Sequence, residues 1–411
     1  MSINPIPDPK RKRATKQPAL VITEPTVFAK SAHADIKEHM NVFGYAVVQV
    51  LNAEECSRAI VDQVKNILTK QPWIEKLQVK DRVTDELLDI DVDAQRYVAE
   101  LTTPGIPADA LDHYDSVWPL HKGFGACCDP PAFHLGTMYD VRQDADLYEV
   151  AGVVLGSKTG LFFTLDRCIQ KLPGKGNPEF LHWDLNIFNP ETRETQTHDP
   201  TMCGKVMFTE SAFICVPGTH TLEFAKEFKD IYLPIYRKTN PSAAKFGLDP
   251  KKDDPMNLRD MRQAIAIPAG CAIFWSPYLL HGTQKNPIDQ GIEFGMYLGY
   301  MTDIDRPDYK DGNERHDRID SYLVGRAPAM YPSLDPTHYY PARYDNFQRM
   351  LDPYVDKTAS DYEGRWGRVI KSGSMKGVYV RTLKPVLDPA YVPPRLSSLG
   401  EMMLGLRAWD V

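Results

Sequence analysis

The stretch "FLHWDLNIF", residues 180–188, places His182 and Asp184 two positions apart in an otherwise apolar run. Alternate residues of a β-strand point to the same face, so a strand here would present this imidazole and carboxylate together, with Trp183 on the opposite face. Imidazole and carboxylate are both metal ligands. The pair predicts half of a metal site, although H-x-D alone more often marks a core histidine beside a capping aspartate.

A third ligand is available further along the chain. The stretch "WSPYLLHGTQKN", residues 275–286, carries His281 directly after an apolar segment that is typical of a strand. Two histidines and one carboxylate on one face of a metal leave its other positions open, which is the arrangement used for Fe(II) that binds a cosubstrate and then O₂.

Composition limits the classes of protein that this chain can represent. With 411 residues we expect one large domain with additions, or two domains that share a core. Apolar residues at 43% and aromatic residues at 10% exclude wholesale disorder. The formal net charge of -7 argues against a nucleic-acid-coating protein, since phosphate binding needs a surplus of Lys and Arg.

Cysteine use and hydropathy indicate the compartment. The seven cysteines include no C-x-x-C pair, so we expect reduced thiols and no disulfide framework. No apolar run approaches the roughly 20 residues of a membrane span, and the N-terminus lacks an apolar signal core. We therefore expect a cytoplasmic protein without membrane partners. A nuclear-import signal or nucleic-acid arm is the alternative for the basic run Lys10, Arg11, Lys12 and Arg13, which we interpret as a solvated tail.

The order of segments predicts mainly β structure with flanking helices, an α+β chain. A Val-rich strand at 45–50 precedes an amphipathic helix at about 53–69, for which Asn52 is the expected N-cap and Glu55 completes the capping pattern. Residues 160–302 are rich in β-branched and aromatic runs without regularly alternating helices, which favours a sandwich or open barrel; one helix at about 220–230 and a polar stretch at 238–260 interrupt them. The predicted organisation is a flexible basic arm at 1–26, a core domain at 27–305 and a Tyr/Pro/Arg-rich extension packed on the core at 306–411.

Three further motifs accompany the candidate ligands: "FGYAVVQVLNAEECSRAI" at 43–60, "FICVPGTH" at 213–220 and "IPAGCAIFWSPYLLHGT" at 267–283. With the H-x-D pair, their order resembles the phytanoyl-CoA dioxygenase-like branch of the Fe(II)/2-oxoglutarate oxygenases, over roughly residues 34–302. The resemblance implies a double-stranded β-helix (jelly-roll or cupin-like) core, and iron bound by His182, Asp184 and His281. It implies 2-oxoglutarate and O₂ as cosubstrates, with release of succinate and CO₂. Related halogenases have a small residue in place of the aspartate, so Asp184 favours hydroxylation.

The chain departs from the family at the cosubstrate anchor. The family places an Arg about ten residues after the second histidine, whereas "HGTQKNPIDQGIEFGMYLGY", residues 281–300, contains none and aligns Ile292 there, beside Glu293. Thr283 matches the family's hydroxyl, but a buried carboxylate also needs a cation. The candidate cations are Lys205 and the pair Arg167 and Lys171; otherwise the cosubstrate is a different one. The alternatives are that Arg167 pairs with Asp166 and that Lys205 is a solvated strand end.

Other residues receive structural interpretations. We expect a turn histidine at His220, core roles for Trp183, Phe208 and Trp275, no metal role for His198 and Asp199, and a scaffold role in preference to ligand contact for His121, Lys122 and Tyr139. The long Pro/Gly/aromatic segment at 100–145 is a candidate lid or cofactor wall.

The sequence thus predicts a non-haem Fe(II)- and 2-oxoglutarate-dependent dioxygenase that hydroxylates a small molecule. One alternative is a catalytically silent or altered-cosubstrate member of the family that acts as a binding or structural module. The other is an oxygenase acting on a protein or nucleic acid, for which the basic arm would help docking. The sequence does not indicate the oligomeric state.

Overall fold

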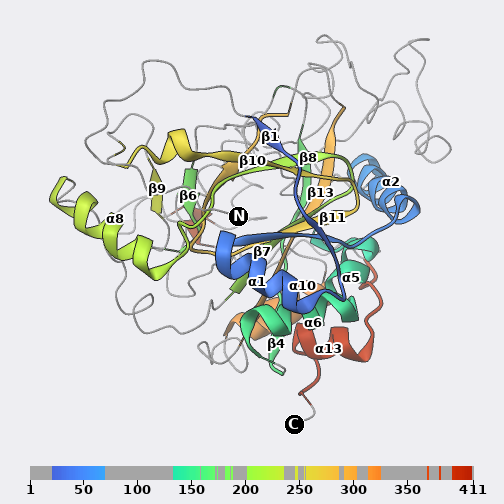
Figure 1. Ribbon diagram of the computed structural model, residues 1–411. Coiled ribbons are helices and arrows are strands. Elements are labelled where there is room, and N and C mark those ends of the chain that lie inside the picture. Colours follow the sequence, from blue (N-terminus) through green and yellow to red (C-terminus); the bar gives the residue numbers. More distant parts are fainter. Residues whose placement is uncertain are drawn as a thin grey trace.

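Two β-sheets packed against each other form the centre of the protein, and helices cover their outer faces (Figure 1). This computed structural model describes residues 21–69, 133–157, 159–171, 174, 181–185, 187, 201–235, 246–248, 254, 256–286, 291–302, 313–324, 368–369, 379–380 and 391–409. The predicted segments at 1–20 and 100–132, with His121 and Lys122, lie outside this range, as do His198 and Asp199 and much of the predicted extension at 306–411.

The first sheet contains six strands, in the order β1 (Ile22–Thr23), β10 (Gln263–Ile267), β8 (Ser211–Val216), β12 (Leu280–Thr283), β6 (Leu181–Trp183) and β9 (Phe246–Leu248). The second sheet follows the order β2 (Val27–Ala29), β3 (Tyr45–Gln49), β11 (Cys271–Trp275), β7 (Thr201–Met207), β13 (Glu293–Thr302) and β4 (Leu161–Phe163). Strand β5, Cys168–Lys171, also pairs with β13. A separate pair joins β14, Arg368–Val369, to β15, Tyr379–Val380.

The chain crosses between the two sheets in a regular pattern. From β5 in the second sheet the chain passes to β6 in the first and β7 in the second. It then forms β8, β9 and β10 in the first sheet, β11 in the second, β12 in the first and β13 in the second. All pairings among these strands are antiparallel. This alternation is a double-stranded β-helix of the jelly-roll type, as the family resemblance of the sequence implies.

Strand alternation separates the side chains of each sheet into inner and outer sets. The inner faces of both sheets share one apolar cluster, which includes Val47, Ile169, Cys203, Phe213, Ile273 and Trp275. The outer face of the second sheet packs on helices, through residues such as Val48, Val206, Phe274 and Leu298. The outer face of the first sheet packs on a third cluster with Trp183, Phe228 and Tyr278. The space between the sheets is therefore a separate environment from the helix-covered faces.

The helices have the bounds His33–Phe43 (α1), Ala53–Thr69 (α2), Gly136–Arg142 (α5), Ala145–Leu155 (α6), Leu222–Ile235 (α8), Asn313–Val324 (α10) and Ser398–Leu404 (α13), with a 3-10 turn at Leu258–Met261. The predicted capping pattern of α2 is confirmed. The backbone amide of Glu55 donates to Asn52 Oδ1 at 3.0 Å, and the amide of Asn52 donates to Glu55 Oε2 at 2.8 Å. No helix within the described ranges is long and apolar enough to cross a membrane.

The turn between β10 and β11 depends on Gly270. Its φ of +81° lies in the left-handed region, and its carbonyl accepts the amides of Val50 and Leu51, each at 2.9 Å. A Cβ at this position would lie 2.2 Å from the carbonyl oxygen of Leu51, so only glycine fits here. This close contact fixes the start of β11, the strand that leads towards His281.

The C-terminal segment 391–409 packs against the helices that cover the second sheet, and Figure 1 shows α13 beside α6 and β4. Arg318 on α10 donates to the carbonyl of Leu404 at 3.0 Å, and Trp409 stacks on Tyr148 of α6. Met403 and Leu404 are fully buried in the same cluster as the outer face of the sheet. The C-terminal helix α13 therefore belongs to the main core.

Truncation of Leu404 tests this packing. We expect Leu404→Ala to lower the free energy of unfolding by about 2–4 kcal/mol, because it removes buried methyl groups and leaves a cavity. Leu406, which is 39% exposed, is the matched control, and Leu406→Ala should change that free energy by less than about 0.5 kcal/mol. Urea unfolding of the two variants measures the difference, and equal effects would contradict a buried role for the C-terminal helix.

Candidate metal centre

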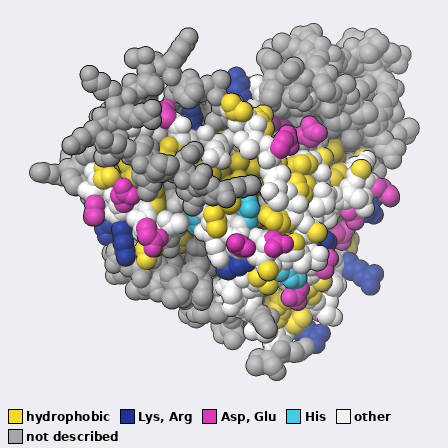
Figure 2. Space-filling view, in the orientation of Figure 1, with side chains coloured by type: hydrophobic (Ala, Val, Ile, Leu, Met, Phe, Trp, Pro, Cys, Tyr) yellow, Lys and Arg dark blue, Asp and Glu magenta, His cyan; other side chains and the backbone are white. Residues whose placement is uncertain are grey.

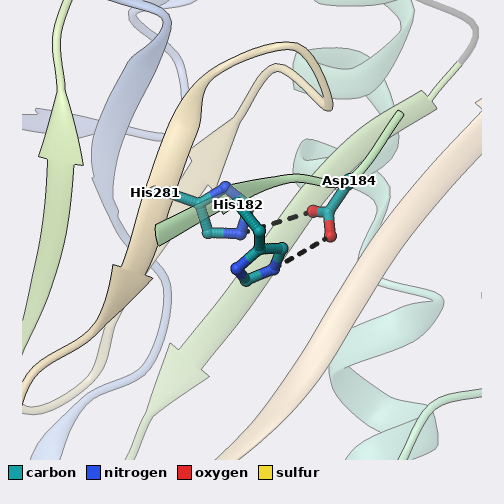
Figure 3. Close-up of side chains that lie close together, drawn as sticks. All are labelled: His182, Asp184 and His281. Atoms are coloured by element: carbon teal, nitrogen blue, oxygen red, sulfur yellow. Dashed lines mark ion pairs between the residues drawn. The ribbon is translucent and has the colours of Figure 1, made fainter. Parts of the chain in front are cut away.

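Three side chains predicted as metal ligands converge on one point between the sheets (Figure 3). His182 on β6 and His281 on β12 are directly opposed in the antiparallel ladder, and their ring centroids are 4.3 Å apart. The Asp184 carboxylate faces both rings, with Oδ1 at 3.4 Å from His182 Nε2 and Oδ2 at 3.5 Å from His281 Nε2. One ligand atom from each residue lies within 4.8 Å of the others.

The backbone around Asp184 differs from the predicted strand. The sequence predicts that His182 and Asp184 share one strand, but β6 ends at Trp183 and Asp184 lies in the bend that follows. The ladder stops because the amides of Asp184 and Leu185 both donate to the carbonyl of Pro277, at 3.0 and 3.1 Å. The turn between β11 and β12 therefore sets the position of the aspartate, which still faces the two imidazoles.

A backbone contact fixes the chemical form of His281. Its Nδ1 lies 2.9 Å from the carbonyl oxygen of Leu279, which can only accept a hydrogen bond, so Nδ1 carries the proton. Nε2, which faces Asp184 at 3.5 Å, is then the nitrogen that can bind a metal. Proteins usually orient a metal-binding histidine in this way, through a hydrogen bond from the ring nitrogen that does not bind the metal.

The donor set fits a divalent transition metal. Two imidazole nitrogens and one carboxylate suit Fe(II), and three protein ligands leave positions for exogenous ligands. His281 is 5% exposed, and the side chains of His182 and Asp184 are 12% and 13% exposed, so all three ligand candidates are largely buried.

Thr283 and Lys205 lie on the inner side of the sheets. Thr283 lies two residues after His281 on β12 and therefore on the same face, opposite Phe213 of β8. Lys205, near the middle of β7, donates from Nζ to the carbonyl of Ala212 at 3.2 Å, and its Nζ lies 5.9 Å from the centre of the Phe213 ring. Phe213 stacks on His281, with ring centroids 5.5 Å apart. The two predicted anchors and His281 thus surround one aromatic ring.

The predicted alternative of a solvated strand end for Lys205 is wrong, because the side chain is only 7% exposed. Burial, together with the positive charge of Lys171, lowers the pKa of the Lys205 ammonium to about 7, while Glu293 opposes this change. Without a nearby anion, the buried surroundings therefore disfavour the charged form of Lys205.

Lys171 is already paired with a carboxylate. It lies opposite Glu293 in the ladder between β5 and β13, and its Nζ is 2.6 Å from Glu293 Oε2 and 2.8 Å from the carbonyl oxygen of Gln284. Ser211 also donates to Glu293 Oε2, at 2.9 Å. Glu293, which is the neighbour of the position where the family has its Arg, therefore neutralises a cation on the inner face.

Arg167 has two contacts that occupy its guanidinium. Its Nη1 lies 3.3 Å from Asp166 Oδ1, which confirms the predicted neighbouring pair. The same group lies over the ring of Tyr297, 5.0 Å from the centroid. Arg167 is thus close to the inner face but shared between an acidic and an aromatic neighbour.

Several structural interpretations of other residues are confirmed. Trp183 and Phe208 are buried in the core, and His220 lies in a turn with its Nε2 at 3.0 Å from the Asn41 carbonyl oxygen. Tyr139 is fully buried, and its hydroxyl lies 2.9 Å from His134 Nδ1. Burial raises the pKa of this hydroxyl far above its usual range.

Trp275 is buried as predicted, but it also contacts the metal centre, which the sequence interpretation missed. Its Nε1 donates to Asp184 Oδ2 at 3.1 Å. The available signal was the alternation along β11, which places Cys271, Ile273 and Trp275 on the inner face that His281 also lines.

Comparison with known proteins gives a family match. Residues 132–290 match the family model "Phytanoyl-CoA dioxygenase (PhyH)". Comparison with curated proteins gives no match. Similar solved structures include EctD from S. alaskensis with 2-oxoglutarate and 5-hydroxyectoine, at 13% identity and a TM-score of 0.38, covering 67% of this chain and 77% of that chain. They also include the epimerase SnoN with Fe3+, alpha ketoglutarate and nogalamycin RO, at 14% identity and a TM-score of 0.37, covering 66% of this chain and 84% of that chain.

The double-stranded β-helix, the His-Asp-His cluster and the family-model match together support a non-haem Fe(II)/2-oxoglutarate oxygenase. The matched residues 132–290 include His182, Asp184 and His281.

Proposed function

We propose that this protein is an Fe(II)- and 2-oxoglutarate-dependent dioxygenase that hydroxylates a small-molecule substrate and releases succinate and CO₂. The convergence of His182, Asp184 and His281 at one point between the sheets is the observation that supports this proposal. Iron bound there would couple oxidative decarboxylation of the 2-oxo acid to hydroxylation of a substrate C–H bond, with one atom of O₂ going to succinate and the other to the product. A carboxylate at Asp184 fills one ligand position with protein, which favours hydroxylation.

The protein residues have separate tasks in this proposal. His182, Asp184 and His281 hold the metal, and the Leu279 carbonyl keeps His281 in the form that offers Nε2. The aromatic rings of Phe213 and Trp275 line the same centre and exclude water from one side. The 2-oxo acid occupies positions that the three protein ligands leave open.

Thr283 and Lys205 are the proposed anchors of the distal carboxylate. Thr283 lies about 6–7 Å beyond His281 along β12, at the ordinary rise of a strand, which suits a five-carbon dicarboxylate lying along the inner face. Lys205 is the better cation of the candidates because Lys171 is paired with Glu293 and Arg167 with Asp166. In this proposal Lys171 and Arg167 contribute positive charge near the site but do not contact the distal carboxylate.

Coupled turnover tests the activity. With Fe(II), O₂ and 2-oxoglutarate, we expect the purified protein to release succinate slowly in the absence of substrate and faster when a substrate is present. Protein with the Asp184→Ala substitution is the control and should release none above background. If the wild-type protein bound Fe(II) but released no succinate, with or without a library of small molecules, the alternative of a catalytically silent binding module would be favoured.

The departure at Glu293 motivates a comparison of cosubstrates. Because a carboxylate on the inner face already engages Lys171 and Ser211, a 2-oxo acid without a second carboxylate is the alternative to 2-oxoglutarate. We expect 2-oxoglutarate to bind the metal-loaded protein more tightly than 2-oxobutyrate, since only the former can pair with Lys205. Equal or reversed affinities, measured by calorimetry, would contradict the assignment of 2-oxoglutarate.

The charge distribution bears on two predictions about partners, namely a small-molecule substrate and no binding of nucleic acid. Figure 2 shows the described Lys and Arg side chains dispersed among Asp and Glu on this face, and the net charge is -7. Both features agree with a small-molecule substrate. Deletion of residues 1–20, which carry the basic run, should leave succinate release unchanged; loss of activity would favour a protein or nucleic-acid substrate.

A further inference from the structure

Trp275 contacts two of the three predicted metal ligands without being a ligand itself. It is the last residue of β11, paired with Tyr45 of β3 and Cys203 of β7, and it is 5% exposed. Its ring centroid lies 5.1 Å from that of His281, and its Nε1 donates to Asp184 Oδ2 at 3.1 Å. An indole N–H can only donate, so it neither binds a metal nor exchanges a proton with the carboxylate.

We infer that Trp275 is a positioning residue that holds the Asp184 carboxylate so that it binds a metal through a single oxygen. The inference rests on the proposed function, since it assumes that Asp184 is a ligand. Hydrogen bonds from the amides of Asp184 and Leu185 to Pro277 fix the backbone, but they leave the side-chain torsions of the aspartate free. The indole N–H restricts those torsions, because rotation of the carboxylate would break a buried hydrogen bond.

The two restraints on Asp184 come from one segment. Trp275 ends β11, and Pro277 lies in the connection from β11 to β12, which leads to His281. The backbone of this connection is itself held, since the Ser276 amide donates to the Gly44 carbonyl at 2.9 Å. A carboxylate restricted to one coordinating oxygen leaves a metal position available, and neighbours that orient the ligands commonly change metal affinity by about 10- to 100-fold.

A conservative substitution separates the hydrogen bond from the packing. In Trp275→Phe an aromatic ring remains beside His281 and Phe213, but the donor is lost. Trp409→Phe is the matched control, because Trp409 stacks on Tyr148 away from the metal ligands. We expect Trp275→Phe to bind Co(II) about tenfold more weakly than wild type and to change the visible absorption spectrum of bound Co(II), as the carboxylate becomes free to use both oxygens. The control should match wild type in both measurements.

The outcomes distinguish this inference from the proposed function. Failure of the wild-type protein to bind Co(II) would overturn both. Wild-type binding with an unchanged affinity and spectrum in Trp275→Phe would overturn only the role of Trp275, leaving the ring as packing.

An NMR measurement covers the case in which Trp275→Phe does not fold. In wild-type protein labelled at the tryptophan indole nitrogens, Zn(II) should shift one of the six indole N–H signals strongly and slow its exchange with solvent. If no indole signal moved, the inference would be wrong.

Discussion

The double variant His182→Ala/His281→Ala is expected to lose Fe(II) binding completely. It removes both imidazole ligands, which face each other across the ladder between β6 and β12, and leaves Asp184 alone. One carboxylate cannot hold iron at micromolar concentrations against water. Succinate release should disappear with the metal. Equilibrium dialysis with Fe(II) under anaerobic conditions, followed by iron analysis, measures the loss.

His220→Ala is the matched control for the double variant. His220 lies in the turn after β8, where its Nε2 is 3.0 Å from the Asn41 carbonyl oxygen, and it belongs to no cluster with the three ligands. We expect this variant to bind one equivalent of Fe(II) like wild type. The single substitutions His182→Ala and Asp184→Ala should each abolish binding in the same assay. Iron retained by the double variant would show that the metal centre lies elsewhere.

The fold was predictable to the extent that local patterns determine it. β-Branched and aromatic runs predicted the strands β7, β8, β10, β11 and β13, and the Asn52 and Glu55 pair predicted the start of α2. The end of β6 was not predictable, because it depends on hydrogen bonds to Pro277, almost a hundred residues further along the chain. Contacts between distant segments leave no periodic signal in either segment.

The cluster of His182, Asp184 and His281 was predictable because the H-x-D spacing and the motifs around each residue are local features. The neighbours of the ligands were not. Trp275 reads as an ordinary core residue until the register of β11 places its N–H beside Asp184. Likewise, Lys205 reads as a surface lysine until β7 is found between β11 and β13, where both neighbouring strands bury it. The chemistry of a side chain in a central strand depends on which strands flank it.

Substitution of Lys205 by methionine is expected to weaken 2-oxoglutarate binding by on the order of a hundredfold. Removing one member of a buried charge pair costs about 2–5 kcal/mol, since the other charge is left without a partner. Methionine has a similar length but no charge. The exposed lysine at position 285 provides the matched control, and Lys285→Met should bind 2-oxoglutarate like wild type. Calorimetry on the Mn(II)-loaded proteins measures both. An unchanged affinity in Lys205→Met would transfer the anchor to Lys171 or Arg167.

The pH dependence of binding gives an independent test of the same anchor. In the absence of an anion, burial and Lys171 hold the pKa of Lys205 at about 7, so its charged form dominates below this pH. Glu293 on β13 and Lys171 on β5 are the charged groups facing it, and they are paired with each other. A bound dicarboxylate favours the ammonium and raises its pKa, so binding above pH 7 takes up a proton. We therefore expect affinity to fall with rising pH, by up to about tenfold per unit between roughly pH 7 and pH 9.

Metal-loaded protein is needed for this measurement, because metal binding to histidine is itself coupled to proton release and must be complete before 2-oxoglutarate is added. Calorimetry in two buffers with different ionisation enthalpies counts the protons taken up directly. In wild type we expect uptake approaching one proton per 2-oxoglutarate above pH 7 and little below it. Lys205→Met should show weak binding with no such uptake. If the wild-type affinity were independent of pH or increased with pH, the distal carboxylate would be bound by a group that is charged throughout, and Lys205 would serve only to pack the inner face.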